Sequence, residues 1–94
     1  MAKYKALGDY DRWSMVFLYD PATGDIVYSH QELSMKGAPH SDPSGLAEEA
    51  VEHATRAGVK AADKMASLHV DDPGSLDYDV RYTVDVTTRA LVRA

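Results

Sequence analysis

The segment Trp13–Tyr19 constrains the fold more than any other part of the sequence. Its side chains alternate between two faces, and hydrophobic residues occupy both of them. The next residues read Asp20-Pro-Ala-Thr-Gly24. The aspartate is typical of the start of a turn, the proline fixes φ at its first corner, and the glycine supplies a positive φ at its exit. This pattern predicts a β-hairpin whose first strand is central in a sheet, because both of its faces are largely apolar.

The return strand is expected to start at Asp25 and to run to Leu33. It becomes polar after Tyr28, so its far end is expected to be solvated or functional. Residues 34–43 contain two prolines and a glycine, which predicts a loop.

An alanine-rich helix is predicted after this loop. Asp42 or Ser44 is suited to cap its free N–H groups, and Pro43 suits its first position. One stripe of the helix consists of small and aliphatic residues: Leu46, Ala47, Ala50, Val51, Ala54 and Ala57. Alanines in this stripe let the helix approach the sheet closely, so bulky strand residues must fill the space between them.

Gly58 is expected to end or kink this helix, because a glycine adopts the left-handed conformation that terminates helices. A short helical turn over residues 61–65 would follow. The alternative is one unbroken helix to Ser67, at a cost of about 1 kcal/mol for the internal glycine.

Three further strands are predicted in the second half of the chain. The first is Ser67–Asp71, and a turn over residues 72–75 follows it. The alternation over Tyr78–Val86 is the most regular in the sequence. Residues 87–89 then turn the chain, and residues 90–93 return as the last strand.

The fold class predicted from these elements is α+β. We expect an antiparallel sheet of four to five strands with one main helix packed on one face, in the order β-β-α-β-β-β. The length of 94 residues allows one domain. This domain is expected over residues 12–94, preceded by a flexible N-terminal arm over residues 1–11.

One face of the predicted sheet has no helix to cover it. An open apolar face is typical of an interface, in which Tyr and Trp are common. The candidate interface residues belong to the first strand: Trp13, Met15, Phe17 and Tyr19. The alternative is that the N-terminal arm and the loop over residues 34–43 cover this face.

Composition excludes several classes of function. The net charge of −5 argues against a nucleic-acid-binding module, which normally carries a basic patch. The absence of cysteine excludes disulfides, thiolate metal sites and cysteine nucleophiles. No apolar run is long enough for a membrane span, so we expect a soluble, cytoplasmic protein. No cofactor is predicted.

The histidines are the first candidates for chemistry, but none of the four lies in a spacing typical of a metal site. His30 lies at the polar end of its strand, and His40 lies in the loop beside Ser41 and Asp42. The neighbours of His40 do not predict a catalytic triad, because adjacent residues cannot generally adopt triad geometry. The candidate binding residues are Tyr28, His30, Glu32 and His40.

Two functional hypotheses follow, and no catalytic residue is assigned under either. The first is an interaction module without enzymatic activity, either a homodimer or a subunit that binds a protein partner through the open face. The second is a small enzyme or ligand-binding protein with a site at a subunit boundary near His30 and His40. A weaker third reading is an acidic protein that masks a basic partner, which the net charge permits.

Overall fold

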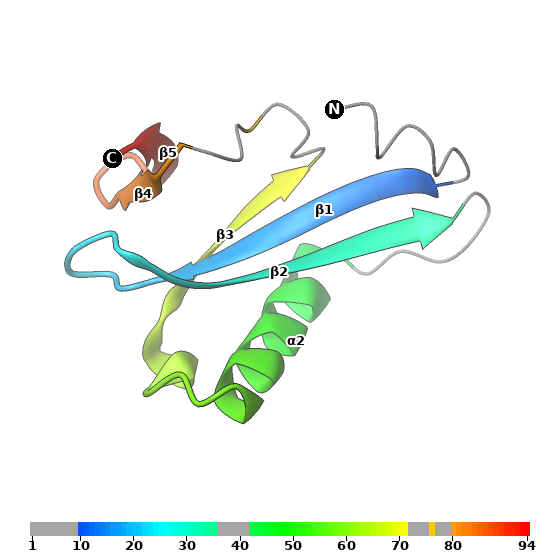
Figure 1. The fold of residues 1–94 in the computed structure, drawn as a ribbon, viewed down its shortest axis with the longest axis horizontal. Coiled ribbons are helices and arrows are strands. Elements are labelled where there is room, and N and C mark those ends of the chain that lie inside the picture. Colours follow the sequence, from blue (N-terminus) through cyan, green and yellow to red (C-terminus); the bar gives the residue numbers. More distant parts are fainter. Residues whose placement is uncertain (1–9, 36–41, 72–75, 77–79) are drawn as a thin grey trace.

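The larger of two sheets contains three antiparallel strands (Figure 1). The computed structural model describes residues 10–35, 42–71, 76 and 80–94. Strand β1 spans Tyr10–Tyr19, β2 spans Ile26–Met35 and β3 spans Ala66–Asp71, in the spatial order β2-β1-β3. The central position predicted for the first strand is therefore confirmed, although this strand begins earlier than Trp13.

The turn between β1 and β2 has the chemistry that the sequence predicts. The Oδ1 atom of Asp20 accepts a hydrogen bond from the Ala22 N–H at 2.8 Å, and the Asp20 carbonyl accepts one from the Gly24 N–H at 2.7 Å. Gly24 adopts a φ of 84°, the left-handed conformation that favours glycine. Asp20 and Gly24 thus close the hairpin together.

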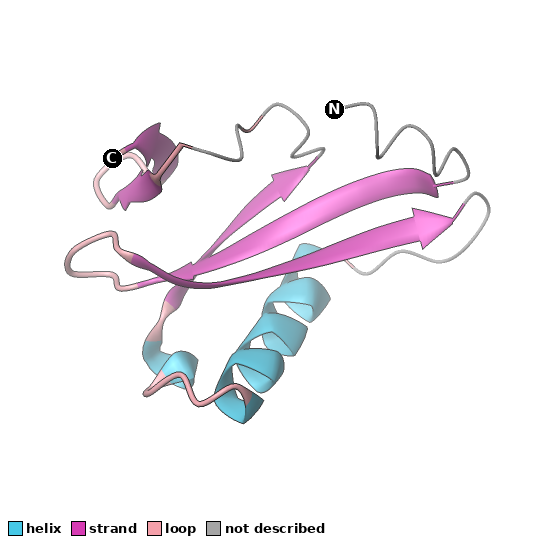
Figure 2. Cartoon of the chain, in the orientation of Figure 1, coloured by secondary structure: helices cyan, strands magenta, loops and turns pink. Residues whose placement is uncertain are grey.

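Helix α2 spans Pro43–Arg56 and covers one face of the three-stranded sheet (Figure 2). Asp42 is the N-cap, and its carboxylate accepts a hydrogen bond from the Gly45 N–H at 2.7 Å. At the other end, Val59 N–H binds the Ala54 carbonyl and Gly58 N–H binds the Thr55 carbonyl, which is a Schellman motif.

The predicted stop at Gly58 is confirmed, because this glycine has a φ of 92°. The 3₁₀ helix η1 follows at Ala62–Lys64, within the range where a short helical turn is expected. The alternative of one unbroken helix to Ser67 is therefore wrong.

The core lies between α2 and the centre of the sheet. Its fully buried members come from both layers: Val16, Leu18, Leu46, Ala50, Ala54 and Ala62. The alanines supply little volume, so the larger strand residues Val16 and Leu18 fill the space beneath the helix, as the sequence predicts. Tyr28, Val51 and Val59 pack around the margin.

The last two strands form a separate sheet. Strand β4 spans Tyr82–Asp85 and β5 spans Ala90–Arg93, and among the described strands each pairs with the other alone. The α+β class and the antiparallel pairing are thus confirmed, whereas the single sheet of four to five strands is not. The strand expected over Tyr78–Val86 is found at Tyr82–Asp85, because Val80 and Arg81 precede the strand and Val86 belongs to the turn. Residues 77–79 lie outside the described part.

The β4–β5 turn repeats the chemistry of the first turn. The Oδ1 atom of Asp85 accepts hydrogen bonds from the N–H groups of Thr87 and Thr88. The Asp85 carbonyl accepts one from the Arg89 N–H at 2.6 Å, and Arg89 has a φ of 59°. Arg89 therefore occupies the left-handed position that Gly24 fills in the first hairpin.

The two hairpins meet at the first turn. The Gly24 carbonyl accepts hydrogen bonds from the Val84 N–H at 2.9 Å and from the Thr83 hydroxyl at 2.8 Å. In Figure 1 the β4–β5 hairpin lies on the opposite side of the larger sheet from α2. The β4–β5 sheet therefore contacts the larger sheet at the turn between β1 and β2. It does not pair along the length of any described strand there, so the two sheets are separate.

Candidate functional site

Three of the four candidate binding residues lie in one row beneath α2. In the β1–β2 register Tyr28 is opposite Leu18 and His30 is opposite Val16. Because directly opposed residues share a face, Tyr28, His30 and Glu32 all lie on the face that carries the helix. His40 lies outside the described residues.

His30 contacts two side chains of α2. Its Nε2 atom lies 3.5 Å from Oε1 of Glu49, and its ring meets that of His53 edge to face with centroids 4.6 Å apart. The His30 side chain is only 15% exposed, whereas that of Glu49 is 51% exposed. Glu49 and His53 are four residues apart and so project from one side of the helix. A protonated His30 would form an ion pair with Glu49 at the helix–sheet boundary.

A second polar group lies on the same face of the sheet, at the β3 end. The hydroxyl of the fully buried Ser14 donates to Oδ1 of Asp71 at 2.8 Å. The Nε2 atom of His69 lies 3.6 Å from the same carboxylate oxygen. In a catalytic triad the histidine stands between the hydroxyl and the carboxylate. Here Asp71 takes the middle position, which suits a structural bridge between β1 and β3.

Sequence reasoning missed this Ser14–Asp71–His69 group. Its members come from strands that are far apart in the chain, and nothing local to Ser14 indicates the contact. The only available signal is that Ser14 is the one polar residue in the apolar segment Trp13–Tyr19.

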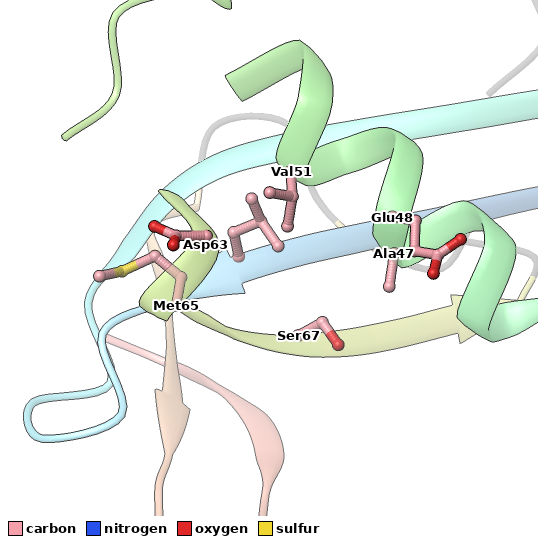
Figure 3. A pocket seen from close by; sticks show the side chains of 7 residues that line it. Ala47, Glu48, Val51, Asp63, Met65 and Ser67 are labelled. Carbon is pink, nitrogen blue, oxygen red and sulfur yellow. The ribbon is translucent and has the colours of Figure 1, made fainter. Parts of the chain in front are cut away.

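An open groove of about 280 Å³ lies between α2, η1 and β3 (Figure 3). It exists because α2 packs over β1 and β2 more than over β3. Its lining combines four apolar side chains with three polar ones: Leu18, Ala47, Val51, Met65, Glu48, Asp63 and Ser67. None of these residues was a predicted site residue, because the groove joins α2, η1 and β3, whose contact no local pattern indicates.

The predicted interface residues of β1 lie on the face away from α2, and most of them are buried. Trp13 and Phe17 are each 8% exposed and Tyr19 is 3% exposed, while Met15 is half-buried. The Trp13 indole N–H donates to Oε1 of Gln31 at 2.8 Å. Three of these four side chains are therefore buried in the single chain, and the interface assigned to them stays a prediction. The arm and the loop that were expected as an alternative cover lie largely outside the described residues.

Among the described residues, no group of three His, Cys, Asp or Glu side chains is arranged to hold a metal ion. In the same part of the chain no helix has the length and hydrophobicity of a membrane span. Comparison with known proteins finds no matching family model, no similar curated protein and no similar solved structure. The residues and their geometry are thus the only basis for a functional proposal.

Proposed function

We propose that this chain is an interaction module that self-associates through the free edge of β3. The proposal rests on the pairing and the burial of that strand. Within the described residues β3 pairs only with β1, and five of its six residues are half-buried. Exposed edges are normally protected by charged side chains, above all Lys, by Pro or by a bulge. The one carboxylate of β3, that of Asp71, belongs to its last residue and accepts a hydrogen bond from Ser14 of β1. β3 contains no lysine or proline, and its register with β1 is regular.

The sequence of β3 is complementary to itself. Ala66, Leu68 and Val70 share one face, and the polar residues Ser67, His69 and Asp71 share the other. An antiparallel pair of β3 strands related by a two-fold axis keeps like faces together. Apolar residues then oppose apolar residues in every allowed register, whether the axis passes through Leu68 or through His69.

The other edge strand is less suited to this contact. β2 carries the exposed polar residues Ser29 and Gln31, and its pairing with β1 has two irregularities. Pairing through β3 would produce a continuous six-stranded sheet with both α2 helices on one face. With strands about 4.8 Å apart, helices centred over β1 would be separated by about 14 Å. This distance exceeds the 8–10 Å of helices in direct contact, so the two helices fit without a clash.

Light scattering coupled to size-exclusion chromatography tests the proposal. We expect a mass twice the 10.3 kDa of one chain. The variant Val70→Lys places a charge on the apolar face of the proposed pair and is expected to shift the protein to the monomer. Val27→Lys, on the edge strand β2, is the matched control and should leave the dimer intact. A wild-type monomer at high concentration would contradict the proposal.

A cross-link reports the contact independently of those variants. The chain contains no cysteine, so a single cysteine introduced at position 68 or 69 can pair only with its copy. Opposed residues of antiparallel strands lie about 4.5–5.5 Å apart, within disulfide range. We expect rapid oxidative dimerisation of either Leu68→Cys or His69→Cys and none of Val27→Cys. Equal, slow oxidation of all three variants would exclude pairing through β3.

A further inference from the structure

The groove between α2, η1 and β3 has a distribution of charge that the proposed self-association does not explain. Its floor is apolar and consists of Leu18, Ala47, Val51 and Met65. The carboxylates of Glu48 and Asp63 lie on opposite sides of this floor, one on α2 and the other on η1 (Figure 3). Both residues are exposed. The groove thus runs from one carboxylate, over an apolar floor, to a second carboxylate.

None of the described residues that line the groove is basic. Lys64 follows Asp63 in the sequence, but it is not among the lining residues. The net charge of −5 favours the approach of a cation to this surface. A matching ligand has two positive ends and an apolar middle.

We propose that this groove binds an aliphatic diamine. The methylene chain lies against Val51 and Met65, and one ammonium group faces each carboxylate. Methionine suits such a floor, because its flexible thioether adapts to a narrow ligand. The volume of about 280 Å³ is near the lower end for small-molecule sites, in keeping with a slender, unbranched ligand.

This site does not depend on the dimer. All the lining residues belong to one chain, so a monomer would carry it complete. In the proposed dimer the two grooves lie on the same face of the joined sheet. Binding and oligomeric state are therefore separate measurements, and either proposal can fail without the other.

Titration with hexamethylenediamine, followed by NMR shifts of the Met65 methyl group, tests the site. Hexylamine has one charged end, and the α,ω-diol of equal length has none. We expect the diamine to bind at least about threefold more tightly than hexylamine, as one added exposed ion pair allows. The diol should bind most weakly, and added salt should weaken the binding of the diamine. Equal affinities for diamine and hexylamine would overturn the two-ended site.

Paired variants separate specific binding from general charge attraction. Removal of both groove carboxylates in Glu48→Gln/Asp63→Asn is expected to weaken binding of the diamine about tenfold, because two ion pairs of about threefold each are lost. Glu52→Gln/Asp25→Asn removes the same charge from exposed residues that do not line the groove, and it should bind like the wild type. An equal loss in both double variants would overturn the proposal. Circular dichroism establishes that each variant is folded.

Discussion

At the scale of single residues, Gly24 has two roles that other residues cannot combine. Its φ of 84° closes the first hairpin, and its carbonyl holds β4 through Thr83 and Val84. A Cβ atom at this position would lie well inside van der Waals distance of the Val84 carbonyl oxygen. Gly58 also has a positive φ, but a Cβ atom there would meet no atom within 4 Å.

We expect Gly24→Ala to destabilise the protein by about 2–4 kcal/mol, the sum of left-handed strain and a steric clash. Gly58→Ala is the control, because it adds the left-handed strain without the clash, and it should cost about 1 kcal/mol. Urea unfolding followed by Trp13 fluorescence measures both. Equal losses in the two variants would mean that contact with β4 contributes nothing to stability.

At the scale of elements, α2 shows how short-range chemistry sets both ends of a helix. Asp42 caps the first turn, and the Schellman motif around Gly58 ends the last one. Hydrogen bonds from the Gly45 backbone N–H and then the Ser44 hydroxyl lower the pKa of Asp42 below its usual 3.8. Since the folded-state pKa is the lower one, the stabilisation from the ionised cap is fully present above the unfolded-state pKa of 3.8. This stabilisation is lost as the pH falls through the folded-state pKa.

Asp42→Asn is expected to keep the cap but lose its titration, because asparagine caps about as well as aspartate. The wild type should be more stable than this variant at neutral pH, where the ionised carboxylate also faces the positive end of the helix dipole. The difference should shrink below a pH of about 3.8. Urea unfolding across this range measures it, with Asp42→Ala as the uncapped control. Parallel pH profiles for wild type and Asp42→Asn would contradict the assignment.

At the scale of the whole molecule, the two sheets are unequal. The larger sheet is packed under α2, and its central strand carries the fully buried Val16 and Leu18. Val84 is the only buried residue of the described β4–β5 hairpin. The described hydrogen bonds from this hairpin to the larger sheet converge on the Gly24 carbonyl. Elements with few buried apolar side chains open at lower free energy than the core.

The rates of native-state hydrogen exchange are therefore expected to differ between the two sheets. The hydrogen-bonded amides of β1 should exchange slowest, at the rate of global unfolding, and those paired between β4 and β5 should exchange through local opening. The Gly24→Ala variant should widen this difference, because it disturbs the contact with Val84. Equal protection in both sheets would show that the hairpin unfolds only with the core.

The sequence by itself determined the features that depend on neighbouring residues. The Asp20–Gly24 turn, the Asp42 cap, the stop at Gly58 and the central position of β1 all follow from local propensity and alternation. It also predicted a candidate set of Tyr28, His30, Glu32 and His40. The first three share a face because they alternate along one strand, and His40 lies outside the described residues.

Only the tertiary structure decided how these pieces meet. The Ser14–Asp71 contact, the His30–His53 pair and the groove each join segments whose separation no local pattern encodes. The same holds for the face of Trp13 and Phe17, which the sequence predicts to be open and the structure buries. Local periodicity indicates which side chains share a face of a strand. What covers that face, and which strand lies at the edge of the sheet, depends on tertiary packing.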